Sequence, residues 1–391
     1  MFRPMRTAAA LALLAATSCS TPEPTYEPLP TVLEVAHSAG AKLGGVAIGD
    51  VLPEHDGPEI VAVCVDGRVI VVHREDGRWR SQVAFQAPGE LIQVAVGDLV
   101  PSYPGDEILA VGMAEGDEDS GGPGAVWLGT RHRDRGFEAR KILETDALQH
   151  AAVIGDVDVG RDGLEALSSG FDQRMHLFTV SMDGGEIEVA HEDVGALPGP
   201  AKGACMEPRP RFGDKMFESG TAFFACASGD LIRASSSTVH DDPFVGISVM
   251  ESVHYASGLA RPAVWVDDRG DGGHMAIAAD DGALVFMGKR SSDVSTFGPS
   301  IVHQESKKLR GAAFLALDDL GTASHVATAG YEGRITAISL ASIEAGAPDP
   351  VTLADTGAAL HHLAAGDVRP DVPGDELVAV GYAGEIYVLS R

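Results

Sequence analysis

The sequence predicts an all-β protein whose chain forms a closed ring of seven four-stranded antiparallel blades, a seven-bladed β-propeller. Three observations lead to this prediction. The 391 residues include 47 Gly and 22 Pro, a composition typical of many short strands joined by turns. One pattern recurs along the chain at a period of about 50 residues, which suits one propeller blade. The last copy ends one strand short, and an unassigned strand precedes the first copy.

The first 18 residues are predicted to be an export signal. Arg3 and Arg6 precede an apolar run, 8–16, that is too short to span a bilayer as a helix. The small residues before Cys19 resemble a bacterial lipobox, which implies that Cys19 carries a lipid and anchors the chain to an outer membrane or cell surface. An ordinary signal cut near the same place is the alternative.

Residues 19–30 are rich in Pro and would form an extended tether. Residues 31–391 would form the propeller.

Each copy of the repeated pattern contains an apolar strand ending at a marker acid, a turn rich in Pro, Gly and Asp, and an acidic residue that opens a second apolar strand. The markers are Asp50, Asp98, Asp156, a diverged copy near Glu207, Asp267, Asp318 and Asp367. In the first copy, strands are predicted over 45–49, 59–65, 68–73 and 81–86. The tight Asp66-Gly67 turn joins the second to the third, and similar turns occur at 281–282, 332–333 and 383–384.

The two ends of the chain are expected to complete one blade together. The seventh copy stops at GEIYVLSR, directly after its third strand, so no fourth strand follows it. The strand TVLEVAH, Thr31 to His37, has the character of an outer strand and is not part of the first copy. We therefore expect it to pair with the last blade and close the ring, which removes unpaired sheet edges.

These repeats resemble the FG-GAP and VCBS families of propeller repeats over residues 45–391. The resemblance implies calcium in loops that read Asp-x-Asp/Asn-x-Asp-Gly with a further acid. The copy DVDVGRDGLE comes nearest, because calcium needs six to eight oxygen ligands and this loop offers Asp156, Asp158, Asp162 and Glu165. It departs from the pattern by one inserted residue, so a calcium brace and a plain acidic turn both remain open. In the other loops, such as 367–376, the first Asp and final Glu are predicted to accept backbone N–H groups.

Three cysteines follow Cys19. Cys205 and Cys226 could form a disulfide between neighbouring strands in an exported protein, with Cys64 left buried. The alternative is that all three are small core side chains.

The formal net charge of −28 makes nucleic acid an unexpected partner, because such a field repels phosphate. The membrane is expected to be met through the N-terminal lipid only, by a monomer.

Histidine and arginine recur near the start of the inner strands, where a central channel would open. This set comprises His150, Arg261, Arg310, His361 and His362. These side chains could bind an anion such as a carboxylated sugar, ligate a metal, or supply a general base, and the alternative is that they pack and hydrogen-bond internally. Because His361 and His362 are adjacent on a strand, at most one of them is expected to face the channel.

Two functions remain open from the sequence. The first is an envelope-tethered binding or scaffold propeller for a protein or glycan partner. The alternative is an exported lyase or hydrolase acting at the channel mouth. The chain has neither H-E-x-x-H nor G-x-S-x-G, which favours the first function without excluding an enzyme that draws its residues from separate blades.

Overall fold

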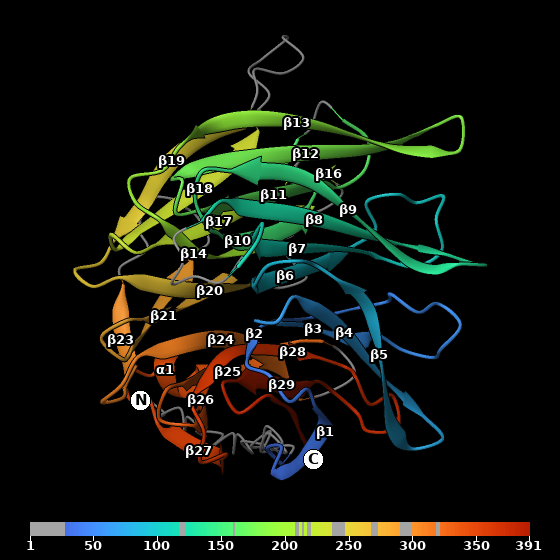
Figure 1. The fold of residues 1–391 in the computed structure, drawn as a ribbon. Helices are drawn as coiled ribbons and strands as arrows, with labels where there is room; N and C mark the ends of the chain where they lie inside the picture. The colour runs from blue at the N-terminus through green and yellow to red at the C-terminus, as the bar shows by residue number, and fades with distance from the viewer. Residues whose placement is uncertain are drawn as a thin grey trace, which may run out of the picture.

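The computed structural model describes residues 28–116, 122–158, 161–207, 211–212, 215–216, 220–236, 247–266, 273–289, 299–317 and 321–391. Within these residues, seven four-stranded antiparallel sheets follow one another around a ring (Figure 1). The predicted seven-bladed β-propeller is therefore confirmed. The export signal and Cys19 lie outside the described residues. No helix in the described part of the chain is long and apolar enough to cross a membrane.

Each blade contributes one inner strand to the ring. The inner strands are β2 (Leu43–Gly49), β6 (Leu91–Gly97), β10 (Gln149–Gly155), β14 (Ala201–Glu207), β20 (Leu259–Val266), β24 (Leu309–Ala316) and β28 (Leu360–Gly366). The second strands are β3 (Glu59–Cys64), β7 (Glu107–Met113), β11 (Glu165–Gly170), β17 (Thr221–Cys226), β21 (Gly273–Ala279), β25 (Ala323–Gly330) and β29 (Glu376–Gly381).

The third and fourth strands of each blade form its outer half. The third strands are β4 (Arg68–Glu75), β8 (Gly124–His132), β12 (Arg174–Asp183), β18 (Asp230–Ser236), β22 (Ala283–Lys289), β26 (Arg334–Ser339) and β30 (Glu385–Ser390). The outer strands are β5 (Arg78–Gln86), β9 (Gly136–Thr145), β13 (Glu186–Ala196), β19 (Ile247–His254), β23 (Ser300–Gln304), β27 (Pro350–Asp355) and β1 (Val32–Ser38). Two elements were not predicted: a short hairpin of β15 (Arg211–Phe212) and β16 (Lys215–Met216), and the helix α1 (Leu340–Glu344).

The N-terminal strand closes the ring, as predicted. Strand β1 pairs antiparallel with β30 from Val32 opposite Ser390 to Ser38 opposite Glu385. Backbone hydrogen bonds continue the pairing at both ends, from Thr31 N to Ser390 O at 2.9 Å and from Ala39 N to Gly384 O at 2.8 Å. In Figure 1 the blue β1 lies beside the red strands of the last blade.

The core consists of layers between neighbouring blades. Every residue of β3 is buried, and its alternating side chains reach two different neighbours. Ile60 and Ala62 pack with the last blade, whereas Val61 and Val63 pack with the second blade. A strand with two buried faces has a continuous apolar sequence, which explains why the second strand of each copy stands out in the chain.

A glutamate at the start of four second strands holds the preceding turn. The Glu59 carboxylate accepts the N–H groups of Val51 and Leu52, each at 2.9 Å. Equivalent bonds from backbone N–H groups are accepted by Glu107, Glu165 and Glu376. The prediction of a structural role for the final Glu is confirmed. Burial raises the pKa of Glu59 and of Glu107 to about 7, and that of Glu376 to about 8.

In two of these four copies an aspartate directly precedes the glutamate and joins neighbouring blades, which the sequence did not suggest. Asp106 accepts the Asp50 N–H at 3.0 Å through its carboxylate and donates its own N–H to Asp50 O at 2.6 Å. Asp375 exchanges the same pair of bonds with Ala316, at 2.9 and 2.8 Å. These two acidic turns therefore hold both their own blade and the contact with the blade before it.

The predicted disulfide between Cys205 and Cys226 is not formed, and both thiols are free, as is Cys64. In the pairing of β14 with β17, Cys205 lies opposite Phe223 and Cys226 opposite Ala201, near the two ends of the ladder. Their side chains also leave the blade on opposite faces: Cys226 packs toward the third blade and Cys205 toward the fifth. Burial raises the pKa of both thiols, which suits the alternative of core side chains.

Candidate functional site

A β-bulge near the start of every inner strand displaces side chains toward the channel mouth. The register shifts immediately after the first residue of each of these strands. A bulge bends its strand and redirects the extra residue. The displaced residues are Gly44, Ile92, His150, Lys202, Arg261 together with Ala260, Arg310 and His361.

Sequence reasoning found four of these positions and missed Lys202. The structure shows that each displaced residue follows the buried residue that begins its inner strand, such as Leu43, Gln149 or Ala201. Lys202 directly follows Ala201, as His150 follows Gln149. The copy around the diverged marker near Glu207 supplied no candidate residue at this position.

Arg261 fills the centre of the ring at this level. Its side chain comes from the fifth blade and is only 2% exposed. The guanidinium donates to Gln93 Oε1 at 3.1 Å, to Gly44 O at 3.2 Å, to Arg310 O at 3.3 Å and to His361 O. These acceptors belong to the first, second, sixth and seventh blades. Together with its own fifth blade, the Arg261 side chain therefore joins five blades.

Close backbone approach makes this arrangement possible. A Cβ added at Gly44 would lie 2.7 Å from Ile92 O, and one at Gly203 would lie 2.7 Å from the Cγ atom of Arg261. Desolvation, with repulsion from Arg310 as the next cause, lowers the pKa of Arg261 to about 9. The residue still carries its charge at neutral pH.

The three predicted histidines are engaged internally. His150 Nδ1 donates to Lys202 O at 2.9 Å, and His361 Nδ1 donates to Gly44 O at 2.6 Å. His362 Nδ1 accepts the Val46 N–H at 2.9 Å. Desolvation lowers the pKa of His150 to about 3 and those of His361 and His362 well below the usual value, so all three are neutral at pH 7.

Around this closed centre lies an arc of charged and aromatic side chains, which we call the mouth arc. It comprises Lys42, Lys202, Asp280, Lys308, Arg310, Tyr331 and Tyr382. Asp280 accepts from Lys202 Nζ at 2.5 Å and pairs with Arg310 Nη1 at 3.1 Å and with Lys308 Nζ at 3.8 Å.

The aromatic half of the mouth arc continues from Arg310. The guanidinium carbon of Arg310 lies 5.1 Å from the centre of the Tyr331 ring, and the hydroxyls of Tyr331 and Tyr382 are 2.9 Å apart. Tyr382 stacks on His361 and carries Lys42 Nζ 5.2 Å from its ring centre. Tyr382 is 40% exposed, so this half of the arc is open to a partner.

The described carboxylates of the predicted calcium loop bind protein groups or lie at the surface, and calcium at this loop stays a prediction. Glu165 is already bonded to two backbone N–H groups, and buried Asp158 pairs with Arg161 Nε at 3.0 Å. Asp162 is exposed at the surface. Among the residues with described positions, no group of three or more His, Cys, Asp or Glu side chains could hold a metal ion. A guanidinium next to the carboxylates supplies the positive charge that calcium would bring.

A chelator is therefore expected to leave the melting temperature of the purified protein unchanged, and added calcium is expected not to raise it. A ligand that binds only the folded state raises the melting temperature, and the rise grows with the ratio of free ligand to its dissociation constant. Thermal unfolding followed by circular dichroism, with and without EDTA and then with excess calcium, checks this. A calcium-dependent rise in melting temperature would contradict the structural assignment of this loop.

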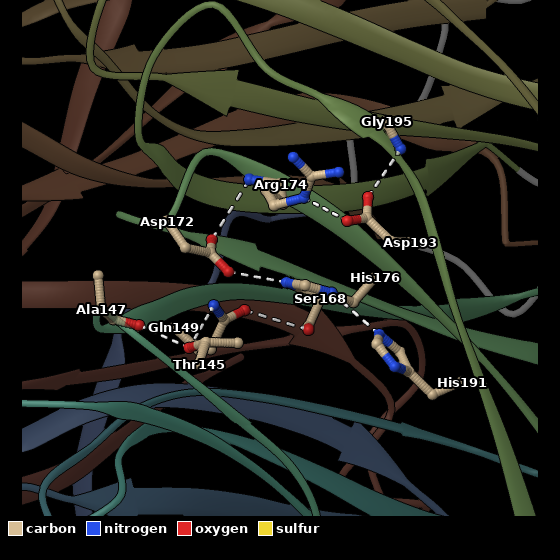
Figure 2. Close-up of polar contacts among 10 residues, drawn as sticks. All are labelled: Thr145, Ala147, Gln149, Ser168, Asp172, Arg174, His176, His191, Asp193 and Gly195. Atoms are coloured by element: carbon tan, nitrogen blue, oxygen red, sulfur yellow. Dashed lines mark hydrogen bonds and ion pairs between the residues drawn. The ribbon is translucent and has the colours of Figure 1, made fainter.

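The third blade carries a second polar cluster that sequence reasoning missed. Figure 2 shows His176 between Asp172 and His191: its Nε2 donates to the Asp172 carboxylate at 2.7 Å, and its Nδ1 lies 3.0 Å from His191 Nε2. Arg174 binds Asp193 beside them. These contacts join the turn after β11 to the strands β12 and β13, and so brace the outer hairpin of this blade.

No family model matches the chain, and no curated protein matches it in sequence. Among solved structures, the chain is similar to the WD40 repeats of RRP9, with a TM-score of 0.62 and 11% identity. The match covers 92% of this chain and 98% of the other. At this identity the likeness shows the fold alone, a β-propeller like that of a WD40 repeat protein. Membership of the FG-GAP or VCBS family stays a prediction.

Proposed function

We propose that this protein is an exported binding propeller, held at the cell envelope by a lipid on Cys19, that docks a protein partner on the mouth arc. The observation that carries the proposal is the mouth arc itself. Tyr and Arg are the residues most enriched at the energetic centres of protein interfaces, and here they form one connected surface. The fold is compatible with such a scaffold role.

The charge of the mouth arc indicates the chemistry of the partner. Lys42, Lys202, Lys308 and Arg310 contribute four positive charges, and Asp280 contributes one negative charge. This local excess of positive charge lies on a chain whose formal net charge is −28. A partner that presents carboxylates would be attracted to this face and repelled elsewhere, which sets its orientation as well as its affinity.

Binding is favoured over catalysis because the candidate catalytic groups have other roles. The guanidinium of Arg261 bonds to four acceptors inside the ring, and the Nδ1 atoms of His150 and His361 donate to main-chain carbonyls. A general base must reach a proton of the substrate. Both histidines are more than 90% buried, so they are placed to hold the ring together.

The docking surface is tested by capture from an envelope extract with tagged full-length protein. The wild type and the Lys141→Glu control, whose charge change lies on the exposed β9, are expected to retain the same proteins. Lys308→Glu and Tyr382→Ala are expected to lose at least one of them, and that protein should bind the purified wild type directly. Identical capture by all four proteins, with unchanged folding, would exclude the mouth arc as the docking surface.

The tether is tested separately by fractionation. Wild-type protein is expected in the membrane fraction, whereas Cys19→Ser is expected to lose the lipid and appear in the soluble exported fraction. A Cys64→Ser variant controls for the loss of a thiol elsewhere. Recovery of Cys19→Ser in the membrane fraction would contradict the lipid anchor and leave the docking proposal untouched.

A further inference from the structure

An open cleft of about 310 Å³ lies between the second and third blades, on the side of the ring away from the mouth arc. Its lining includes Tyr103, Leu128, Thr130, His132, Arg135 and Arg140. Tyr103 belongs to the turn that follows β6, whereas the channel-mouth bulge lies at the beginning of β6. The cleft and the mouth arc are therefore at opposite ends of the inner strands and can act independently.

The outer hairpins of these two blades build the cleft. Strands β8, β9, β12 and β13 have 9 to 11 residues, whereas β26 and β27 have 6 each. The longer strands project beyond the ring at the right of Figure 1. Leu128 and Thr130 point to one face of β8, and their cross-strand partners Arg140 and Glu138 line the same face of the hairpin.

The third blade supplies the opposite wall. The tip of its hairpin, with Gly185 and Ile187, lines the cleft. Arg140 Nη1 donates to Ile187 O at 3.0 Å and ties the two blades together at this point. The Asp172–His176–His191 contacts hold the base of the same hairpin (Figure 2). The wall is therefore supported at both ends, as a preformed binding site requires.

The polar groups in the cleft alternate between donors and acceptors. His132 Nδ1 lies 3.4 Å from the Tyr103 hydroxyl and 3.3 Å from Arg135 Nη2, and His132 Nε2 lies 3.3 Å from the Glu138 carboxylate. Arg135 and Arg140 balance Glu138 and Glu186 in charge. Leu128, which is 2% exposed, provides an apolar floor.

We propose that this cleft binds a neutral hexose unit of a glycan, an activity separate from the protein docking proposed above. Its volume lies at the lower end of the range for small-ligand sites, which suits one sugar ring. Neighbouring hydroxyls on a sugar both donate and accept, so they match side chains that offer both functions within a few ångströms. The apolar face of the ring fits against Leu128 and Ile187. Because the charges in the cleft balance and the whole protein carries a net negative charge, an anionic ligand is disfavoured.

The proposal is tested by saturation-transfer NMR on the purified full-length protein with glucose, galactose, mannose and N-acetylglucosamine. At least one sugar is expected to receive saturation, with a dissociation constant in the millimolar range. Thr130→Val keeps the shape of the buried side chain and removes its hydroxyl, and Arg140→Met removes the donor group. Each is expected to weaken binding of that sugar about five-fold, the effect of one lost hydrogen bond.

The control is Arg80→Gln, on an exposed outer strand of the first blade, which is expected to bind the sugar as the wild type does. Tyr382→Ala is also expected to bind normally, since the mouth arc is not part of the cleft. Absence of transfer to all four sugars overturns the proposal. So does equal transfer in the wild type and in both cleft variants. Neither result affects the docking of a protein on the mouth arc.

Discussion

Deletion of residues 31–37 is expected to leave the protein unable to form a soluble folded monomer. These residues include all of β1 except Ser38, and β1 is the fourth strand of the last blade. Without it, β30 becomes a sheet edge, although the side chains from Ile386 to Ser390 are buried in the intact ring. An exposed edge backed by apolar residues pairs with other chains, so aggregation is the expected outcome. Size-exclusion chromatography and circular dichroism of the deletion variant check this.

A matched control separates the backbone of β1 from its side chains. Val35 is 52% exposed, and the Val35→Thr substitution keeps the β-branched shape of the side chain. The free energy of unfolding of this variant should therefore stay within about 0.5 kcal/mol of that of the wild type. This result would assign the contribution of β1 to stability to its main-chain pairing with β30. A monomeric deletion variant with the melting temperature of the wild type would refute closure of the ring by this strand.

Arg261→Met is expected to lower the free energy of unfolding by about 3 kcal/mol, although a buried charge is removed. The substitution leaves Gln93 Oε1 and the carbonyls of Gly44, Arg310 and His361 without the guanidinium that they accept from. Gly44 O still accepts from His361 Nδ1. Each other buried acceptor that loses its donor costs about 1–3 kcal/mol, and relief of the desolvation cost of the cation offsets part of the sum. For a ring of this size the melting temperature should fall by about 4 °C.

Two further variants test the geometry of this interaction. Arg261→Lys keeps the charge but loses the planar fork, so its melting temperature should lie between those of Arg261→Met and the wild type. Arg310→Met, in the neighbouring blade, removes a partly exposed cation paired with Asp280 and should cost less. Unchanged stability of Arg261→Met would show that the ring does not depend on a central guanidinium.

The repeated pattern predicted the blades well because each second strand is buried on both faces. In β3, β7 and β29 every residue is buried, which gives continuous apolar runs that are visible in the chain. The turn at Asp66-Gly67 was equally clear, because Gly67 has a φ of +87° that favours glycine. The helix α1 and the hairpin of β15 and β16 have no counterpart in other copies, so periodicity gave no signal for them.

The candidate site was predicted in part. His150, Arg261, Arg310 and His361 gather at the channel mouth, but the sequence did not distinguish a ligand-binding centre from a structural one. That distinction depends on Arg261 reaching acceptors that are distant in sequence, such as the carbonyl of Gly44, 217 residues away. Tyr331 and Tyr382 were not recognised, although both occupy the same position, directly after the glycine that ends the second strand of their blades.

The sequence by itself determined the number of blades, the closure by the first strand and the structural use of the glutamates in the turns. Each of these follows from a local pattern that repeats along the chain, either the burial of a strand or the hydrogen bonding of a turn. The tertiary structure decided which side chains meet: the Arg261 centre, the mouth arc and the cleft between the outer hairpins. These sites combine residues from different blades, and only closure of the ring brings those blades together.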